Sequence, residues 1–167
     1  MAISIKRTNL YASLAVILFL ELTFFNKFRI FGVRPELLMT AAIFFGFHFG
    51  VSYGAEAGLA SGIIKDIFSI SPFGINTVSF LLIGAAAGFL KDKVFKENAI
   101  TQFAFSFLSV CVSSAAVFIY LTETASSGVG GAFWKTCLCK GIYTGFLAPI
   151  TFFILNAAFK PKNLQDL

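Results

Sequence analysis

Charge is scarce in this chain of 167 residues: only 13% of residues are charged and 57% are hydrophobic, with a mean hydropathy of +0.85. A water-soluble domain needs more polar residues to cover its surface, so the composition excludes one and favours a lipid bilayer as the solvent. The net charge is +5, but the basic residues are scattered among apolar runs. This scatter indicates loops beside anionic lipid and argues against a nucleic-acid-binding surface.

The residues that usually carry catalysis are also few. His48 is the only histidine, which excludes paired histidine-metal sites, and we interpret it as a solvated ring in a turn. The three cysteines, Cys111, Cys137 and Cys139, lack CxxC spacing, so buried free thiols are expected. No phosphate-binding GxxxxGK[ST] or GxGxxG motif occurs. The sequence therefore predicts no enzyme, no metal site and no cofactor.

Long apolar runs fill the rest of the chain and are separated by short loops. They predict a single all-α polytopic membrane domain over residues 1–167, with no cleavage site after the first run. Six membrane helices are expected, at residues 9–25, 36–49, 52–68, 77–92, 99–121 and 136–158.

Glycine recurs at every fourth position from Gly46 to Gly62. A single helix over 36–68 would be about 50 Å long, far more than a bilayer core of about 30 Å, so the chain must turn back, and Gly50 suits the turn. Three glycines then share one face of the third helix, which packs either inside the bundle or against a partner's helix. These glycines are Gly54, Gly58 and Gly62.

Arg34 and Asp66 would lie at equal depth on either side of a turn at Gly50. Near hydrocarbon an unpaired charge is costly, so we predict that the two side chains form an ion pair at the outer mouth of the hairpin. Pro35 is expected at the first position of the second helix, and Asn76 is expected to cap the fourth helix after the turn at Ser71–Gly74.

Other charged side chains inside apolar segments must also find a partner or reach the membrane interface. Glu21 is expected to reach Lys27 or the interface, and Lys140 is expected to snorkel. Glu56 either snorkels or pairs with a lysine of segment 91–93.

The distribution of basic residues gives a weak indication of orientation. With the N-terminus inside, seven basic residues flank the cytoplasmic ends and six flank the outer ends. The dense cluster at 91–96 favours both termini in the cytoplasm.

Several short motifs follow one another in a fixed order: Arg34-Pro35-Glu36-Leu37-Leu38, the glycine-rich hairpin, Asp66, and Ser-Pro-Phe-Gly-Ile-Asn at 71–76. This order resembles that of the MreD family of rod shape-determining proteins. The chain departs from the family pattern at Glu36, where aspartate is more usual, and at His48 and Ser52, where arginines are frequent. The residues assigned to structure or partner contact are Arg34, Pro35, Glu36, Gly54, Gly58, Gly62, Asp66, Pro72, Phe73, Gly74 and Asn76.

The resemblance implies a non-catalytic scaffold of the cell-elongation machinery in the bacterial inner membrane, with both termini cytoplasmic. Its implied partners are a bitopic MreC-like protein, a RodA-like glycosyltransferase, a class B penicillin-binding protein and, indirectly, actin-like MreB. The implied six-helix fold is similar to the substrate-binding subunit of energy-coupling-factor transporters. A vitamin-binding subunit of such a transporter is the alternative function.

Overall fold

The computed structural model describes residues 7–23, 33–69, 73–94, 98–124 and 130–159. These ranges contain six α-helices and no β-sheet. The expected six segments are confirmed as helices, with one shift of six residues at the start of the last helix. The helices are α1 (Arg7–Thr23), α2 (Leu37–Phe49), α3 (Val51–Phe68), α4 (Ile75–Phe89), α5 (Ala99–Thr124) and α6 (Gly130–Phe159).

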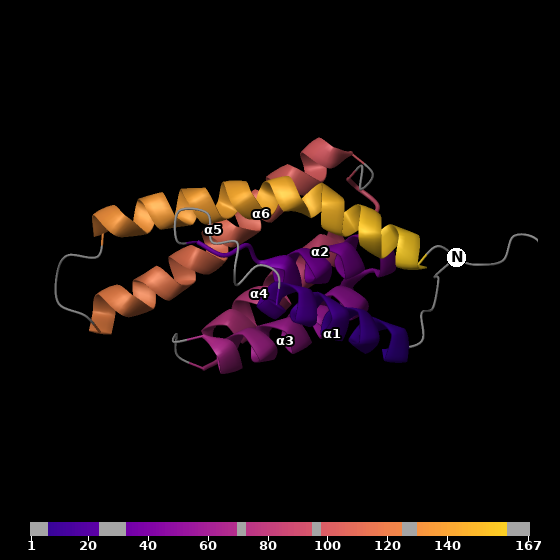
Figure 1. Ribbon diagram of the computed structural model, residues 1–167, viewed down its shortest axis with the longest axis horizontal. Coiled ribbons are helices and arrows are strands. Elements are labelled where there is room, and N and C mark those ends of the chain that lie inside the picture. Colours follow the sequence, from indigo (N-terminus) through magenta and orange to yellow (C-terminus); the bar gives the residue numbers. More distant parts are fainter. Residues whose placement is uncertain (1–6, 24–32, 70–72, 95–97, 125–129, 160–167) are drawn as a thin grey trace, which may run out of the picture.

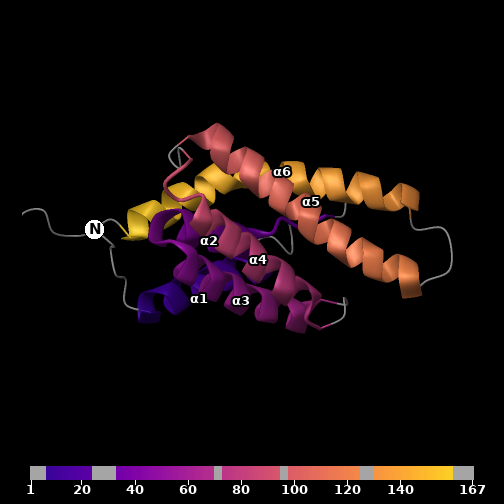
Figure 2. The ribbon, with the colours of Figure 1, turned by 180° about the vertical axis from the view of Figure 1, so that it is seen from behind.

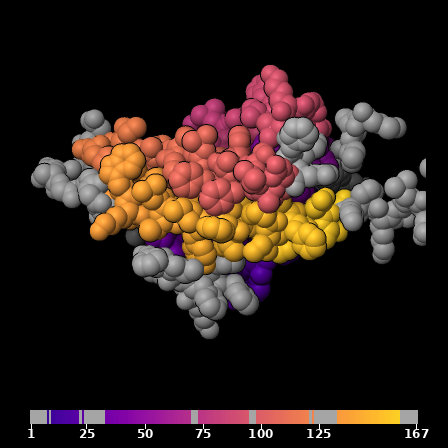
Figure 3. All heavy atoms as spheres, turned by 90° about the horizontal axis from the view of Figure 1, so that it is seen from above, coloured from indigo at the N-terminus to yellow at the C-terminus, as the bar shows by residue number. Residues whose placement is uncertain are grey.

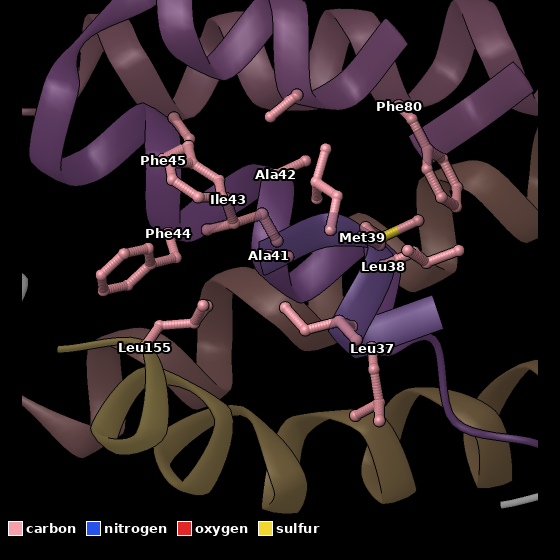
Figure 4. Packing of buried hydrophobic residues seen from close by; sticks show 14 of the residues in the cluster. Leu37, Leu38, Met39, Ala41, Ala42, Ile43, Phe44, Phe45, Phe80 and Leu155 are labelled. Atoms are coloured by element: carbon pink, nitrogen blue, oxygen red, sulfur yellow. The ribbon is translucent and has the colours of Figure 1, made fainter. Parts of the chain in front are cut away.

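Helix α2 lies at the centre of the molecule. Every residue from Leu37 to Phe47 is buried, which explains why this helix is apolar on all sides. Figure 4 shows its side chains pointing toward several neighbouring helices, with Phe80 of α4 and Leu155 of α6 among the residues around them. Ring contacts extend this core, and Phe44 packs edge-on against Phe152 of α6 with centroids 5.3 Å apart.

The predicted turn at Gly50 is confirmed. Gly50 adopts φ +96°, a conformation that favours glycine, and it directly joins α2 to α3. The chain therefore reverses between two adjacent helices with a single intervening residue.

Helices α3 and α4 pack backbone against backbone through glycine. A Cβ added at Gly58 would lie 2.7 Å from the carbonyl carbon of Phe80 and 3.0 Å from the Cα of Leu81. The same seam includes Gly54 and Gly84, whose backbones lie against each other. The glycine face of α3 thus packs inside the chain, as one of the two expected alternatives predicts.

Helices α5 and α6 form a long hairpin that covers one face of the molecule and extends past the ends of the other helices (Figures 1, 2 and 3). Their apolar spans, Ala99–Tyr120 and Phe133–Phe159, are long enough to cross a membrane. Three shorter apolar helices accompany them within the described residues, at Leu10–Glu21, Leu37–Phe49 and Ile75–Phe89. This arrangement fits a helical membrane protein.

Candidate functional site

A network of charges, one buried and three half-buried, occupies the end of the bundle where α1 and α3 finish and α2 begins. Glu36, directly before α2, is 1% exposed, and its Oε1 accepts a hydrogen bond from Lys140 Nζ at 2.5 Å. Lys65 Nζ lies 3.7 Å from the same oxygen and 3.3 Å from Oε1 of Glu21. Side chains from α1, α3 and α6 therefore meet at the start of α2.

The same residues also satisfy the backbone at the start of α2. Glu21 Oε2 accepts a hydrogen bond from the Leu38 N–H at 3.0 Å, and Thr144 Oγ1 accepts one from the Glu36 N–H at 3.1 Å. The first N–H groups of a helix have no partner within the helix, so α1 and α6 complete the N-terminus of α2. Pro35 is buried but lies two residues before the first helical residue, so its predicted place inside the helix is wrong.

Two expectations about these charges are corrected. Lys140 does not snorkel, because its ammonium group is bound by the buried carboxylate of Glu36. Glu21 pairs with Lys65, and Lys27, its expected partner, lies outside the described residues. The attraction of opposite charges at a site of low exposure outweighs the route to the interface.

Asp66 caps the N-terminus of α4. Its carboxylate accepts hydrogen bonds from the backbone N–H groups of Gly74, Asn76 and Thr77 at 2.9, 3.2 and 3.0 Å. The side chains of Asn76 and Thr77 donate to it as well, at 2.9 and 2.5 Å. The predicted capping role of Asn76 is therefore wrong: Gly74 is the N-cap residue, and the oxygen acceptor comes from α3.

The predicted ion pair between Arg34 and Asp66 is also wrong, because Asp66 takes its partners from α4. Arg34 is exposed and has no ion pair or hydrogen bond with any residue that the structure describes. Adjacent residues on a helix diverge by about 100°, so Lys65 faces α2 while Asp66 faces α4. Equal depth along the hairpin does not place two side chains on the same face.

Two hollows adjoin the network and share its lysines. The small hollow, of about 200 Å³, is bounded by Glu36 and by residues of α3, α4, α5 and α6, including Asn76, Ser113 and Ser114. The large hollow, of about 590 Å³, is bounded by residues that include Leu18, Glu21, Arg34 and Ile64. Lys65, Ser69, Thr136 and Lys140 line both of them.

The remaining predicted site residues divide between packing and surface. Gly54, Gly58 and Gly62 lie in the seam with α4, and Phe73, 71% exposed, lies beside the N-terminus of that helix. Pro72 lies outside the described residues.

Two polar side chains at the opposite end have surroundings that differ from those predicted. His48 lies in the last turn of α2, stacked on Phe44 with ring centroids 4.2 Å apart, and not in a solvated turn. The Tyr11 hydroxyl of α1 donates a hydrogen bond to Glu56 Oε1 at 2.6 Å. This partner of Glu56 was not predicted from the sequence.

One carboxylate oxygen of the network has no hydrogen-bond partner among the described residues. Both carboxylates are already paired with lysines, and the described residues contain no group of three or more histidine, cysteine, aspartate or glutamate side chains placed to hold a metal. Glu36 Oε2 is buried without a hydrogen-bond partner within the described ranges, so it offers an acceptor to an incoming donor.

Sequence reasoning missed Lys65 and Lys140 as members of the site. The available signal was a lysine inside each of two apolar helices, next to Asp66 in one case. Only Lys140 receives an individual prediction, that it snorkels, and Lys65 receives none, because the sequence does not show which helix faces each lysine.

The sequence profile of the family described as rod shape-determining protein MreD matches residues 4–158. No match was found among the curated proteins or among the solved structures. The family match covers nearly the whole chain, including α1 to α5 and all of α6 except its last residue, and so extends far beyond the motifs at 34–76. The chain therefore belongs to the MreD family of rod shape-determining proteins.

Proposed function

We propose that this protein is a non-catalytic scaffold of the bacterial cell-elongation machinery, which holds an MreC-like bitopic protein and the peptidoglycan synthases together in the inner membrane. Membership of the MreD family implies a role in rod shape determination, and the family is one of membrane proteins. The scaffold role and the partners are the proposal.

The observation that carries the proposal is the way α3 fixes the segment before α2 relative to the start of α4. Lys65 contacts Glu36, directly before α2, and the next residue, Asp66, holds the start of α4 beside Phe73. Arg34 and Phe73, the exposed residues of the two segments, are therefore carried on parts of the chain that are fixed relative to each other, as a docking surface requires. Next to them, the small hollow presents the free acceptor Glu36 Oε2.

An MreC-like partner is proposed to insert a side chain with an N–H or O–H donor into the small hollow. Such a donor would satisfy Glu36 Oε2, whose burial without a partner is costly. The RodA-like glycosyltransferase and the class B penicillin-binding protein are proposed to contact the outward faces of the long hairpin, where large apolar side chains are exposed. These include Leu108, Val112, Ile119, Ile142 and Phe146. Actin-like MreB is proposed to be an indirect partner of this protein.

All six helices are proposed to lie in the bilayer, with both termini cytoplasmic and the charge network at the outer end. Single cysteines at Phe73 and Lys93, two exposed positions just before and just after α4, test this placement in a background without the native cysteines. A membrane-impermeant thiol reagent should label the first position from outside and the second only after lysis. Labelling of both positions from the same side would contradict the topology.

The docking proposal is tested by filling the small hollow. Ser114, half-buried at its wall, is replaced by phenylalanine, and Ser52→Phe at an exposed position of α3 that lines neither hollow is the matched control. We expect Ser114→Phe to lose co-purification of the MreC-like protein and to produce rounded cells, with thermal unfolding unchanged. Retention of both partner and rod shape would refute docking in this hollow.

The alternative function, a vitamin-binding subunit of an energy-coupling-factor transporter, makes a different prediction. It requires saturable, high-affinity binding of a vitamin by the purified protein. We expect titration calorimetry to show no such binding, and a saturable signal would favour the transporter.

A further inference from the structure

The large hollow combines positive charge with an apolar wall. Arg34, Lys65 and Lys140 line it together with Leu18 and Ile64. Its volume of about 590 Å³ falls within the range of about 300–1,000 Å³ that is typical of small-molecule sites. The question is which ligand has both a charge and an apolar part that match these walls.

The charges around the large hollow do not cancel. Lys65 and Lys140 balance the network carboxylates Glu21 and Glu36, and Arg34 in the wall of the hollow adds one positive charge. Arg34 carries that excess, because it forms no ion pair or hydrogen bond with any described residue. A ligand with one negative charge would neutralise the site, and neutralisation is most favourable close to hydrocarbon.

The cations also keep hydrogen-bond donors in reserve. An ammonium group has three N–H donors, and Lys140 uses one of them, toward Glu36, within the described part of the chain. Arg34 uses none of the five donors of its guanidinium group toward the residues that the structure describes. Donors of this kind, arranged around one opening, suit the oxygens of a phosphate.

The apolar wall runs from this end into the bundle. On α1, Leu18 lies almost one turn deeper than Glu21, and on α3 Ile64 lies one residue deeper than Lys65. Charged groups thus lie at the helix ends and apolar groups continue inward from them, an order that matches a phospholipid standing in a membrane leaflet.

We propose that the large hollow binds one anionic phospholipid, with its phosphodiester on Arg34 and Lys140 and an acyl chain along Leu18 and Ile64. A lipid with net charge −1, such as phosphatidylglycerol, matches the excess charge, and zwitterionic phosphatidylcholine does not. The inference rests on the proposed placement in the bilayer but not on the MreC-like partner, which is assigned to the small hollow.

Native mass spectrometry of the detergent-purified protein tests the site with phosphatidylglycerol and phosphatidylcholine of identical chains. The wild type should retain one phosphatidylglycerol and prefer it about tenfold, because only this lipid adds a net negative charge beside Arg34. Arg34→Ala should abolish that preference, and Arg34→Lys should keep part of it. Lys135→Ala is the matched control, an exposed cation of α6 outside both hollows, and should behave as wild type.

A phosphatidylglycerol with a photoactivatable acyl chain should label peptides containing Leu18 or Ile64, and glycerol phosphate without chains should not compete. Equal retention of the two lipids, a preference that survives Arg34→Ala, or labelling elsewhere would overturn the proposal. The measurements use the protein without its partner, so their failure leaves partner docking to the co-purification test.

Discussion

The two tightest helix pairs, α3–α4 and α5–α6, use glycine in opposite ways. In α3–α4 glycines stand on both helices, and Gly54 lies against the backbone of Gly84. In α5–α6 the glycines stand on one helix only: a Cβ at Gly145 would lie 2.8 Å from the ring of Phe103, and one at Gly141 would lie 2.9 Å from the ring of Phe107.

The difference lies in what can move. A backbone in a packed helix pair cannot retreat without moving the whole helix, but the ring of a phenylalanine can tilt. The α3–α4 pair should therefore be rigid, and the α5–α6 pair should accept a larger side chain at its glycine positions more easily. Polar contacts also differ between the two pairs. Asp66 adds hydrogen bonds between α3 and α4, whereas Lys140 of α6 forms its ion pair with Glu36, outside the α5–α6 hairpin.

The largest effect is expected for Gly58→Leu in the rigid seam. The new side chain meets the backbone of Phe80 and Leu81, so the free energy of unfolding should fall by about 3 kcal/mol or more. Thermal unfolding in detergent measures this change, with Ala86→Leu on the exposed face of α4 as control. Equal stability of the two variants would show that the seam is not rigid.

Lys140→Met should come next, because it breaks the ionic link between the hairpin and α2. Glu36 would keep only the longer contact with Lys65, and we expect a loss of about 2–3 kcal/mol in the free energy of unfolding. Adding Glu36→Gln should recover part of that loss by removing the buried charge. Lys135→Met, at an exposed position, should leave stability unchanged.

Asp66→Ala should cost about 1–2 kcal/mol, because three N–H groups at the start of α4 lose their acceptor. Asp66→Asn, which keeps one acceptor oxygen, should cost less. Asp92→Ala serves as the exposed control. Thermal unfolding and hydrogen exchange in the first turn of α4 report the change, and unaltered exchange there would contradict the capping role.

The smallest effect is expected for Gly145→Ala, below about 1 kcal/mol, since the ring of Phe103 can give way. The matched change, Gly62→Ala in the rigid seam, meets the backbone of Asn76 and Thr77 and should cost more. A reversed order of the two melting temperatures would refute the comparison between the helix pairs.

Local features of the chain were predictable, and pairings across the bundle were much less so. The apolar runs and the turn at Gly50 follow from hydropathy, segment length and glycine's backbone freedom, and the structure agrees with them. The glycine face on α3 was also visible, but its partner was left open between a helix of this chain and one of another protein. The Arg34–Asp66 pair failed because depth along a hairpin says nothing about direction around each helix.

The sequence by itself determined the six helices, their apolar character and the family, because these depend on local composition and on the order of residues along the chain. Only the tertiary structure decided that Glu36 pairs with Lys140, 104 residues away, and that the carboxylate of Asp66 completes a different helix. A buried charge takes the nearest opposite charge or donor in space. Which group is nearest depends on how the helices are rotated and stacked, and the packing of the whole bundle sets that arrangement.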